Sequence, residues 1–141
     1  SAIGASITQL GVARDQMIAV NLAQEGIETV RQIRDSNMLE KWITLDSTTS
    51  WHNGLGEACY WSTRTSLTKI LDCNPAPVYI NNLGFYTQGD GTLTPTIFKR
   101  MIQIKDISGA EKKVTSTVSW TANGGTTKQV QVSESIFGIN S

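Results

Sequence analysis

The chain opens with a long amphipathic run, from Ile3 to Asp35. Apolar residues recur there every three or four positions, the spacing that places side chains on one stripe of an α-helix. The stripe comprises Ile3, Ile7, Leu10, Ala13, Met17, Val20, Ile27 and Val30. A helix of this length spans about 48 Å, whereas a compact chain of this size is about 37 Å across. One end of the helix is therefore expected to protrude from the rest of the fold.

The two halves of this helix have different expected roles. The Asp-Ser-Asn segment at 35–37 favours a helix end, so the C-terminal half is predicted to dock on the rest of the chain. The residues expected to pack this half against a sheet are Ile27, Val30 and Ile33. The N-terminal half is predicted to protrude, and its apolar stripe then needs a partner. The residues expected to face that partner are Ile7, Leu10, Ala13, Met17 and Val20.

Gly26 lies in the middle of the predicted helix, where glycine costs about 1 kcal/mol relative to alanine. Two explanations are open. The position is either a close approach to the sheet or a bend, or it is a tolerated surface glycine.

Composition limits the fold and the function. With 141 residues, of which 39% are hydrophobic, the chain can bury one core. We expect a single domain with a helical stalk at 1–36, a connecting loop region at 37–77 and a sheet at 78–141. Twelve basic and twelve acidic residues cancel, and no basic cluster interleaves with aromatic residues, so specific nucleic-acid binding is not expected.

Cys59 and Cys73 are the two cysteines. We favour a disulfide over two reduced thiols because the segment between them is polar and loop-forming, and because no Cys/His spacing indicates a metal. A disulfide closing a loop of this size contributes about 3 kcal/mol. A bonded pair would place folding outside the cytoplasm.

The region 37–77 is rich in Ser, Thr, Asn and Gly, and it holds Trp42, Trp51 and Trp61. A long loop of this kind carries function or is held by a constraint. The tryptophans are either anchors that pin the loop onto the core, which we favour, or aromatics that face a ligand.

From Val78 onward the apolar period changes to two, which is typical of strands. Strands are predicted at 78–80, 97–107 and 114–120, with a last strand around Val130 and Val132 after a turn at 122–125. Arg100 interrupts the apolar face of the long strand. This pattern predicts an antiparallel sheet of about three to four strands whose apolar face the helix covers, an α+β fold.

The residues do not support catalysis. His52 is the sole histidine, and no Gly-x-Ser-x-Gly motif or Cys/His spacing supplies a nucleophile beside it. Asp72 and Asp90 lack the alternating acidic neighbours of a calcium loop and are interpreted as turn residues. The Gly-rich segment 123–126 lies between predicted strands, so it is interpreted as a hairpin rather than a phosphate loop. We predict no enzyme activity, no cofactor and no metal site.

Two stretches carry a family pattern. Residues 22–28, Leu-Ala-Gln-Glu-Gly-Ile-Glu, and 30–37, Val-Arg-Gln-Ile-Arg-Asp-Ser-Asn, resemble the helix of bacterial type IV pilin-like proteins, which include minor pilins and pseudopilins. Residues 98–104, Phe-Lys-Arg-Met-Ile-Gln-Ile, and 114–120, Val-Thr-Ser-Thr-Val-Ser-Trp, with the hairpin that follows, are similar to the C-terminal sheet of this family. The middle region resembles no family pattern.

The resemblance implies a pilin-like fold and a structural subunit of a type IV pilus or related filament on the bacterial cell surface. The implied partners are other pilin subunits and the pilus assembly machinery. The resemblance also implies a leader, a cleavage site, an N-methylated residue and about 20 apolar residues that continue the helix and anchor it in the inner membrane before assembly. Attachment, twitching motility, DNA uptake and secretion are the implied roles of such a filament.

A second hypothesis is a secreted or surface module that binds a carbohydrate or another ligand on a helical stalk. This module would require at least two of Trp42, Trp51 and Trp61 to be exposed in one patch, whereas anchoring tryptophans would be buried.

Overall fold

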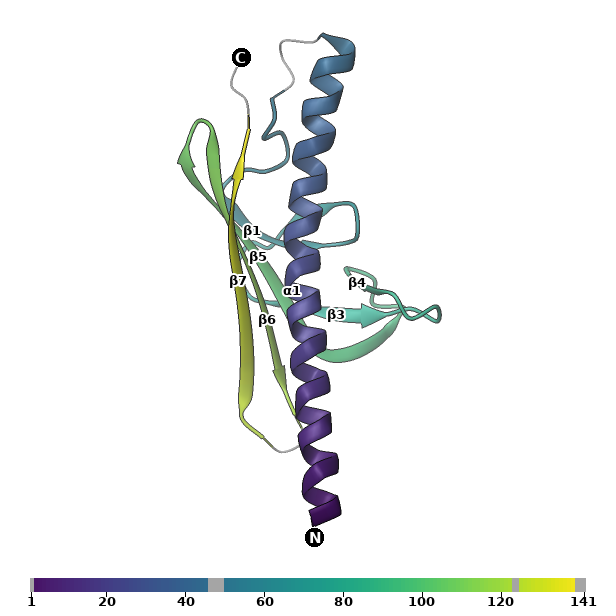
Figure 1. The fold of residues 1–141 in the computed structure, drawn as a ribbon. Coiled ribbons are helices and arrows are strands. Elements are labelled where there is room, and N and C mark those ends of the chain that lie inside the picture. The colour runs from purple at the N-terminus through teal and green to yellow at the C-terminus, as the bar shows by residue number, and fades with distance from the viewer. Residues whose placement is uncertain (1, 46–49, 123–124, 139–141) are drawn as a thin grey trace.

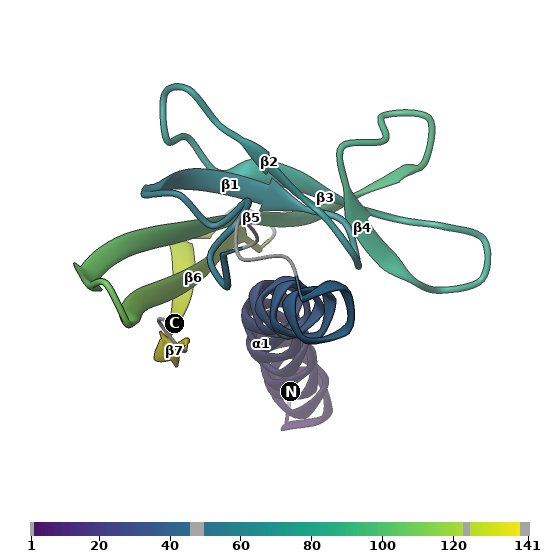
Figure 2. The ribbon, with the colours of Figure 1, turned by 90° about the horizontal axis from the view of Figure 1, so that it is seen from above.

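The computed structural model describes residues 2–45, 50–122 and 125–138, with side-chain surroundings from Leu10 onward. One long helix, α1 (Ala2–Thr44), packs against a curled antiparallel sheet of seven strands. Figure 1 shows α1 running along the sheet and extending past it at both ends. Figure 2, a view along the helix, shows the sheet curving around one side of α1. The predicted α+β arrangement, a long helix on an antiparallel sheet, is confirmed.

The sheet is built around its longest strand, β5. One edge of β5 pairs with β6, which in turn pairs with β7, while the other edge is shared by β1 and β3. The short strands β2 and β4 pair with β1 and β3. The bounds are β1 (Ala58–Ser62), β2 (Leu67–Lys69), β3 (Ala76–Ile80), β4 (Tyr86–Gln88), β5 (Thr94–Ser108), β6 (Glu111–Thr121) and β7 (Thr127–Phe137).

The prediction of three to four strands was wrong, because β1, β2 and β4 add to the sheet. Two of these, β1 and β2, lie in the region 37–77 that was predicted as connecting loop. β2 and β4 have three residues each and β1 has five. Segments this short carry no clear alternation, and they become strands through pairing. β2 and β4 pair with the preceding strands β1 and β3, and β1 also pairs with the distant β5.

The prediction that the helix ends at 35–37 was also wrong, because α1 continues to Thr44. The amide of Asn37 does not cap the helix. Its Nδ2 donates to the carbonyl oxygens of Trp51 at 3.0 Å and Asn53 at 2.8 Å. Good helix formers such as Met38, Leu39 and Glu40 follow and extend the helix.

The turn predicted at 122–125 includes residues 123 and 124, which lie outside the described residues. On either side of it, β6 and β7 pair in continuous antiparallel register from Thr121–Thr127 to Glu111–Phe137. The Gly125 N–H donates to the carbonyl of Ala122 at 2.9 Å.

The core lies between α1 and the concave face of the sheet, in two clusters along the helix. One cluster consists of Ile27, Val30, Trp51, Leu55, Tyr60, Ile102, Ile104, Val114 and Ile136. The other consists of Ala19, Leu22, Ala23, Val78, Phe98, Val118 and Trp120. Both clusters draw on α1, so the helix is part of the core rather than an appended stalk over this length.

Gly26 is buried where the helix comes closest to β5 and β6. A Cβ at this position would lie 2.7 Å from Ser116 Oγ and 3.0 Å from Ile102 Cδ1, closer than van der Waals contact allows. Of the two explanations for this glycine, close packing on the sheet is therefore correct.

Arg100, which interrupts the apolar pattern of β5, points into the core and is 1% exposed. Its Nε donates to Gln88 Oε1 at 3.0 Å, and its Nη2 donates to Ser62 Oγ at 2.8 Å. Its Nη1 donates to the carbonyl of Leu22 on α1 at 2.9 Å. Burial lowers the pKa of this guanidinium to about 10, with Glu25 acting in the opposite direction, so Arg100 is still charged at neutral pH.

Candidate functional site

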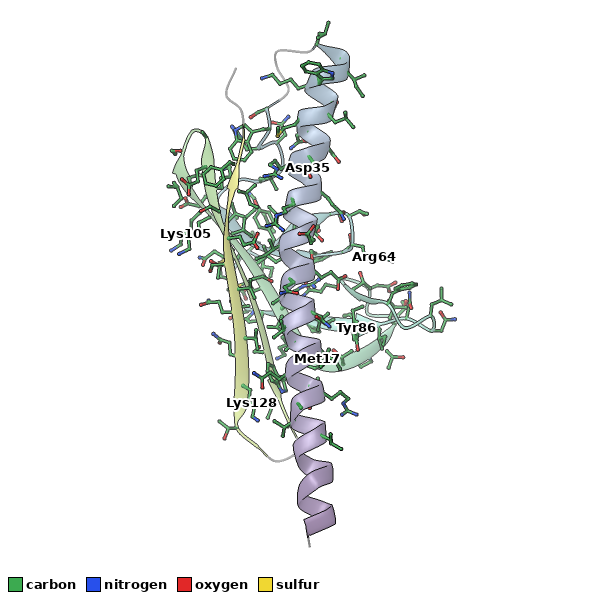
Figure 3. All side chains as sticks on the ribbon, viewed as in Figure 1. Met17, Asp35, Arg64, Tyr86, Lys105 and Lys128 are labelled. Atoms are coloured by element: carbon green, nitrogen blue, oxygen red, sulfur yellow. A yellow bond between two sulfur atoms is a disulfide. The ribbon has the colours of Figure 1, made fainter. Side chains whose placement is uncertain are left out.

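The outer side of the N-terminal half of α1 presents apolar side chains to solvent. Leu10 is 71% exposed and Met17 is 66% exposed, and Ala13 is exposed between them. We call Leu10, Ala13 and Met17 the outer row. Figure 3 labels Met17 on the part of α1 that leads toward its N-terminal end. Val20 is half-buried at the edge of the sheet contact, and the side chain of Ile7 lies outside the described residues.

The apolar stripe does not stay on one face of the helix. At about 100° per residue, Leu10 and Val30 lie about 160° apart around the axis. Val30 is 1% exposed against the sheet, whereas Leu10 faces away from it. Burial of α1 in the sheet contact begins at Ala19 and continues through Leu22 and Ala23. The outer row is thus distinct from the sheet-packing face.

The three residues expected to pack α1 on the sheet lie on the inner side. Ile27 and Val30 belong to the buried core, and Ile33 packs against it while partly exposed.

The predicted disulfide between Cys59 and Cys73 is confirmed, with a Cα–Cα distance of 5.3 Å. The bond joins β1, next to the centre of the sheet, to the segment between β2 and β3. It therefore closes the hairpin that carries β2, whose three residues pair, among the described strands, only with β1. The disulfide supplements the weak pairing of this short strand.

The three tryptophans of the region 37–77 have different surroundings. Trp51 is 2% exposed, and its Nε1 donates to the carbonyl of Gly109, so it anchors its loop to the β5–β6 turn. Trp61 is half-buried and packs over Gly89. Trp42 is 81% exposed and belongs to the last turns of α1 rather than to a loop. A common ligand-facing patch of two or three exposed tryptophans is not formed.

Sequence reasoning missed an exposed apolar cluster at the C-terminal end of α1, because the helix was expected to stop before it. We call it the helix-end cluster, and it consists of Leu39, Trp42, Ile43 and Leu45. The spacing of Leu39, Trp42 and Ile43 is a helical one and could have revealed it.

A small groove lies between α1 and β7. Its volume is about 250 Å³, and it is lined by Gln24, Ile27, Glu28, Arg31, Val132 and Glu134. Arg31 forms ion pairs with Glu28 of its own helix and with Glu134 of β7. Glu28 and Arg31 lie three residues apart on the helix, whereas the contact with Glu134 depends on the tertiary fold.

The two aspartates interpreted as turn residues have that role. Asp90 accepts hydrogen bonds from the hydroxyl and the N–H of Thr92, which lower the pKa of its carboxyl group. Asp72 accepts hydrogen bonds from the N–H and the side-chain amide of Asn74, with the same effect on its pKa. His52 is exposed and lies edge-on to the ring of Trp51.

Among the described residues, no group of three or more His, Cys, Asp or Glu side chains is placed to hold a metal ion. No helix in this part of the chain combines the length and the hydrophobicity that a bilayer crossing requires.

Comparison with known proteins identifies no relative: no family model, no curated protein and no solved structure matches the chain.

Proposed function

We propose that this protein is a structural subunit of a type IV pilus or a related cell-surface filament, and that it polymerises through its N-terminal helix. The observation that carries the proposal is the outer row, in which Leu10 and Met17 are mostly exposed on the side of α1 that the sheet leaves uncovered. Two large apolar side chains at helical spacing on a free helix face are typical of a helix that packs against another helix.

Burial of the outer row supplies a driving force for assembly. Removing a Leu or Met side chain from water contributes about 1.5–3 kcal/mol each as an upper estimate. Each subunit in a filament repeats this contact, so a modest contribution per subunit stabilises the whole polymer. The sheet, on the opposite side of α1, remains free to face solvent.

The remaining features of the proposal follow from the pilin resemblance and are supported by the general architecture. A long helix packed by its middle part on an antiparallel sheet, with one disulfide, is compatible with a pilin-like fold. In this proposal an apolar segment preceding Ser1 anchors the subunit in the inner membrane until the assembly machinery adds it to the filament. The filament is extracellular and serves attachment, twitching motility, DNA uptake or secretion.

The proposal is tested in cells that produce the full-length protein. We expect Leu10→Asp combined with Met17→Asp to reduce the filaments recovered by shearing about tenfold or more, because two charges then lie in the subunit contact. The matched control is Gln32→Asp, which places the same charge on an exposed polar position of the same helix. The melting temperature of the purified domain should be unchanged by all three substitutions. Normal filament yield from the double variant, or no filaments from the unmodified protein, would reject the proposal.

A second candidate function is a surface module that binds a carbohydrate or another ligand on a helical stalk. The patch of two exposed tryptophans expected for this module is not formed, so this candidate rests instead on the helix-end cluster, in which Trp42 is 81% exposed and Leu39 and Ile43 are also exposed. The test is a titration of the protein with a panel of oligosaccharides, followed by tryptophan fluorescence. A response that disappears in Trp42→Ala supports this function, and no response to any member of the panel argues against it.

A further inference from the structure

The strand β7 is a long edge strand of the sheet. It pairs with β6 along its 11 residues, and no other strand in the described part of the chain pairs with it. The outer strands β2 and β4 have only three residues each. Exposed edges present backbone N–H and C=O groups to other chains, and proteins usually protect them by shortening, proline, bulges or charged side chains. The charged residues of β7 are Lys128 and Glu134, which have opposite signs. β7 contains no proline and no shift in its register with β6.

In β7, residues at equal distances before and after Gln131 are chemically alike or complementary. Lys128 lies three positions before it and Glu134 lies three positions after it. The other pairs at equal distance from Gln131 are Val130 with Val132, Gln129 with Ser133, and Thr127 with Ser135. A strand with this pattern is complementary to an antiparallel copy of itself.

The faces of the strand fit the same pairing. Lys128 and Val130 lie opposite the buried Trp120 and Val118 of β6, so they are on the concave side of the sheet. Val132 and Glu134 share this side, since side chains alternate along a strand. If two antiparallel copies of β7 pair, shifting their register by one residue would place residues of the concave face opposite residues of the outer face. A register shift of two residues would set Lys128 of one copy opposite Val132 or Ile136 of the other. Only the register centred on Gln131 sets Lys128 opposite Glu134.

We propose that two copies of the chain pair edge to edge through β7, antiparallel and about a two-fold axis at Gln131, so that their two sheets become one. Each pairing sets Lys128 of one copy opposite Glu134 of the other, twice per dimer. Opposite charges and β-branched residues in such cross-strand positions stabilise a sheet. An interface of this kind is isologous, with the same surface on both copies.

The ion pair between Arg31 and Glu134 is compatible with this contact. Both side chains remain more than a third exposed, so the Glu134 carboxylate can accept from Lys128 of the second copy while it keeps Arg31. The groove between α1 and β7 lies on the same side as Glu134 and would be covered by the second copy. Figure 3 labels Lys128 toward the lower end of β7.

The two-fold relation has a consequence for assembly. Because α1 runs alongside β7 (Figures 1 and 2), the two helices of the pair are antiparallel. Subunits that share one filament through a common N-terminal anchor are parallel, so this contact joins subunits of two filaments that run in opposite directions. The dimer contact goes beyond the proposed function and does not depend on it; only the joining of two filaments rests on that function.

The first test is disulfide trapping in the full chain. The natural cysteines are bonded to each other, so the thiol of Gln131→Cys is the only free one. In the proposed register the two introduced thiols face each other, with Cα atoms about 4.5–5.5 Å apart, a distance that a disulfide can bridge. We expect a covalent dimer on non-reducing electrophoresis after mild oxidation.

The matched control is Gln129→Cys, which is also exposed and lies on the same face of β7. Its two thiols would be offset by four residues, about 14 Å, so its dimer should form at least about tenfold more slowly. Equal rates for the two variants, or no dimer from either, would overturn the proposal.

The second test is a charge reversal followed by analytical ultracentrifugation of the chain without added cysteines. Lys128→Glu turns both Lys–Glu contacts into like-charge contacts and should weaken dimerisation about tenfold or more. Lys113→Glu makes the same change on the outer face of β6 and should leave the dimer within about twofold. Restored dimerisation in Lys128→Glu combined with Glu134→Lys would identify the register, whereas equal effects of Lys128→Glu and Lys113→Glu would contradict it.

Discussion

The guanidinium of Arg100 donates a hydrogen bond to the backbone carbonyl of Leu22 at 2.9 Å, and so joins the middle of the sheet to the middle of α1. Gln88 and Ser62 accept its other hydrogen bonds. No carboxylate is in ion-pair contact with this buried charge among the described residues, which leaves neutral acceptors to compensate the cost of desolvation. These acceptors come from α1, β1 and β4, so Arg100 connects three separate parts of the fold.

We expect Arg100→Ala to lower the free energy of unfolding by at least about 3 kcal/mol, because it leaves a cavity and several buried acceptors with fewer donors. Arg100→Lys should have an intermediate effect, since an ammonium group cannot reproduce the fork of donors. The measurement is urea denaturation followed by circular dichroism, with the exposed neighbour Lys99→Ala as the control. An Arg100→Ala domain as stable as this control would contradict the assignment.

Gly26→Ala should destabilise the protein by about 1–3 kcal/mol, even though alanine favours a helix by about 1 kcal/mol. The reason is that the added Cβ would lie 2.7 Å from Ser116 Oγ. Ser116 Oγ is itself buried without a hydrogen-bond partner among the described residues. Ser116→Ala alone should therefore be neutral or stabilising, by up to about 1 kcal/mol.

The double variant Gly26→Ala with Ser116→Ala separates steric conflict from other causes. Adding Ser116→Ala to Gly26→Ala should raise the free energy of unfolding by more than Ser116→Ala raises it in the unmodified protein. The reason is that the hydroxyl that conflicts with the new Cβ is then absent. Thermal unfolding of the four proteins forms a complete cycle. Strict additivity would show that the cost at position 26 has another origin.

Loss of the Cys59–Cys73 disulfide should cost about 3 kcal/mol, from the conformational freedom that the unfolded chain regains. Cys59→Ala with Cys73→Ala should accordingly lower the melting temperature, and a reducing agent should lower it only in the unmodified protein. Hydrogen exchange should locate the loosened region at β2, which in the part of the chain that the structure describes pairs with β1 alone. An unchanged melting temperature on reduction would contradict this role.

The Asp90 carboxyl group should titrate below its ordinary pKa, chiefly because the Thr92 hydroxyl donates to it and secondly because the Thr92 N–H does. Thr92→Val removes the hydroxyl and should raise the pKa of Asp90 toward its ordinary value. A carboxyl pKa that is lowered in the folded state stabilises the fold at neutral pH, and this contribution is lost as the pH falls through the folded-state pKa. Carbon-detected NMR titration of Asp90 measures the shift directly, with Asp72 as an internal reference.

Local pattern predicted a large part of the fold. The three-and-four spacing from Ile3 onward identified the helix, and the alternation after Val78 identified the strands that became β3, β5, β6 and β7. These elements are long or regular enough for one face to be visible in the residue order. The polar, loop-forming segment between Cys59 and Cys73 was sufficient to favour their disulfide, which the structure contains.

Other features depended on distant residues and left no local signal. The helix passes Asn37 because the amide of that residue bonds to carbonyls in the following loop. Trp51 is an anchor and Trp42 is exposed, although both lie in similarly polar sequence. Arg100 was recognised as an exception to the apolar pattern, but its partners on α1, β1 and β4 could not be inferred from residues next to it.

For the outer row too, part of the result was predictable from the sequence and part depended on the tertiary structure. The sequence by itself determined that α1 is amphipathic and longer than a small domain can cover, because periodicity and length are properties of neighbouring residues. Only the tertiary structure decided which part of that stripe is buried, since about 100° of rotation per residue turns Leu10 away from the sheet while Val30 faces it. It also decided that β7 is a free edge, because strand order results from pairing between segments far apart in the chain.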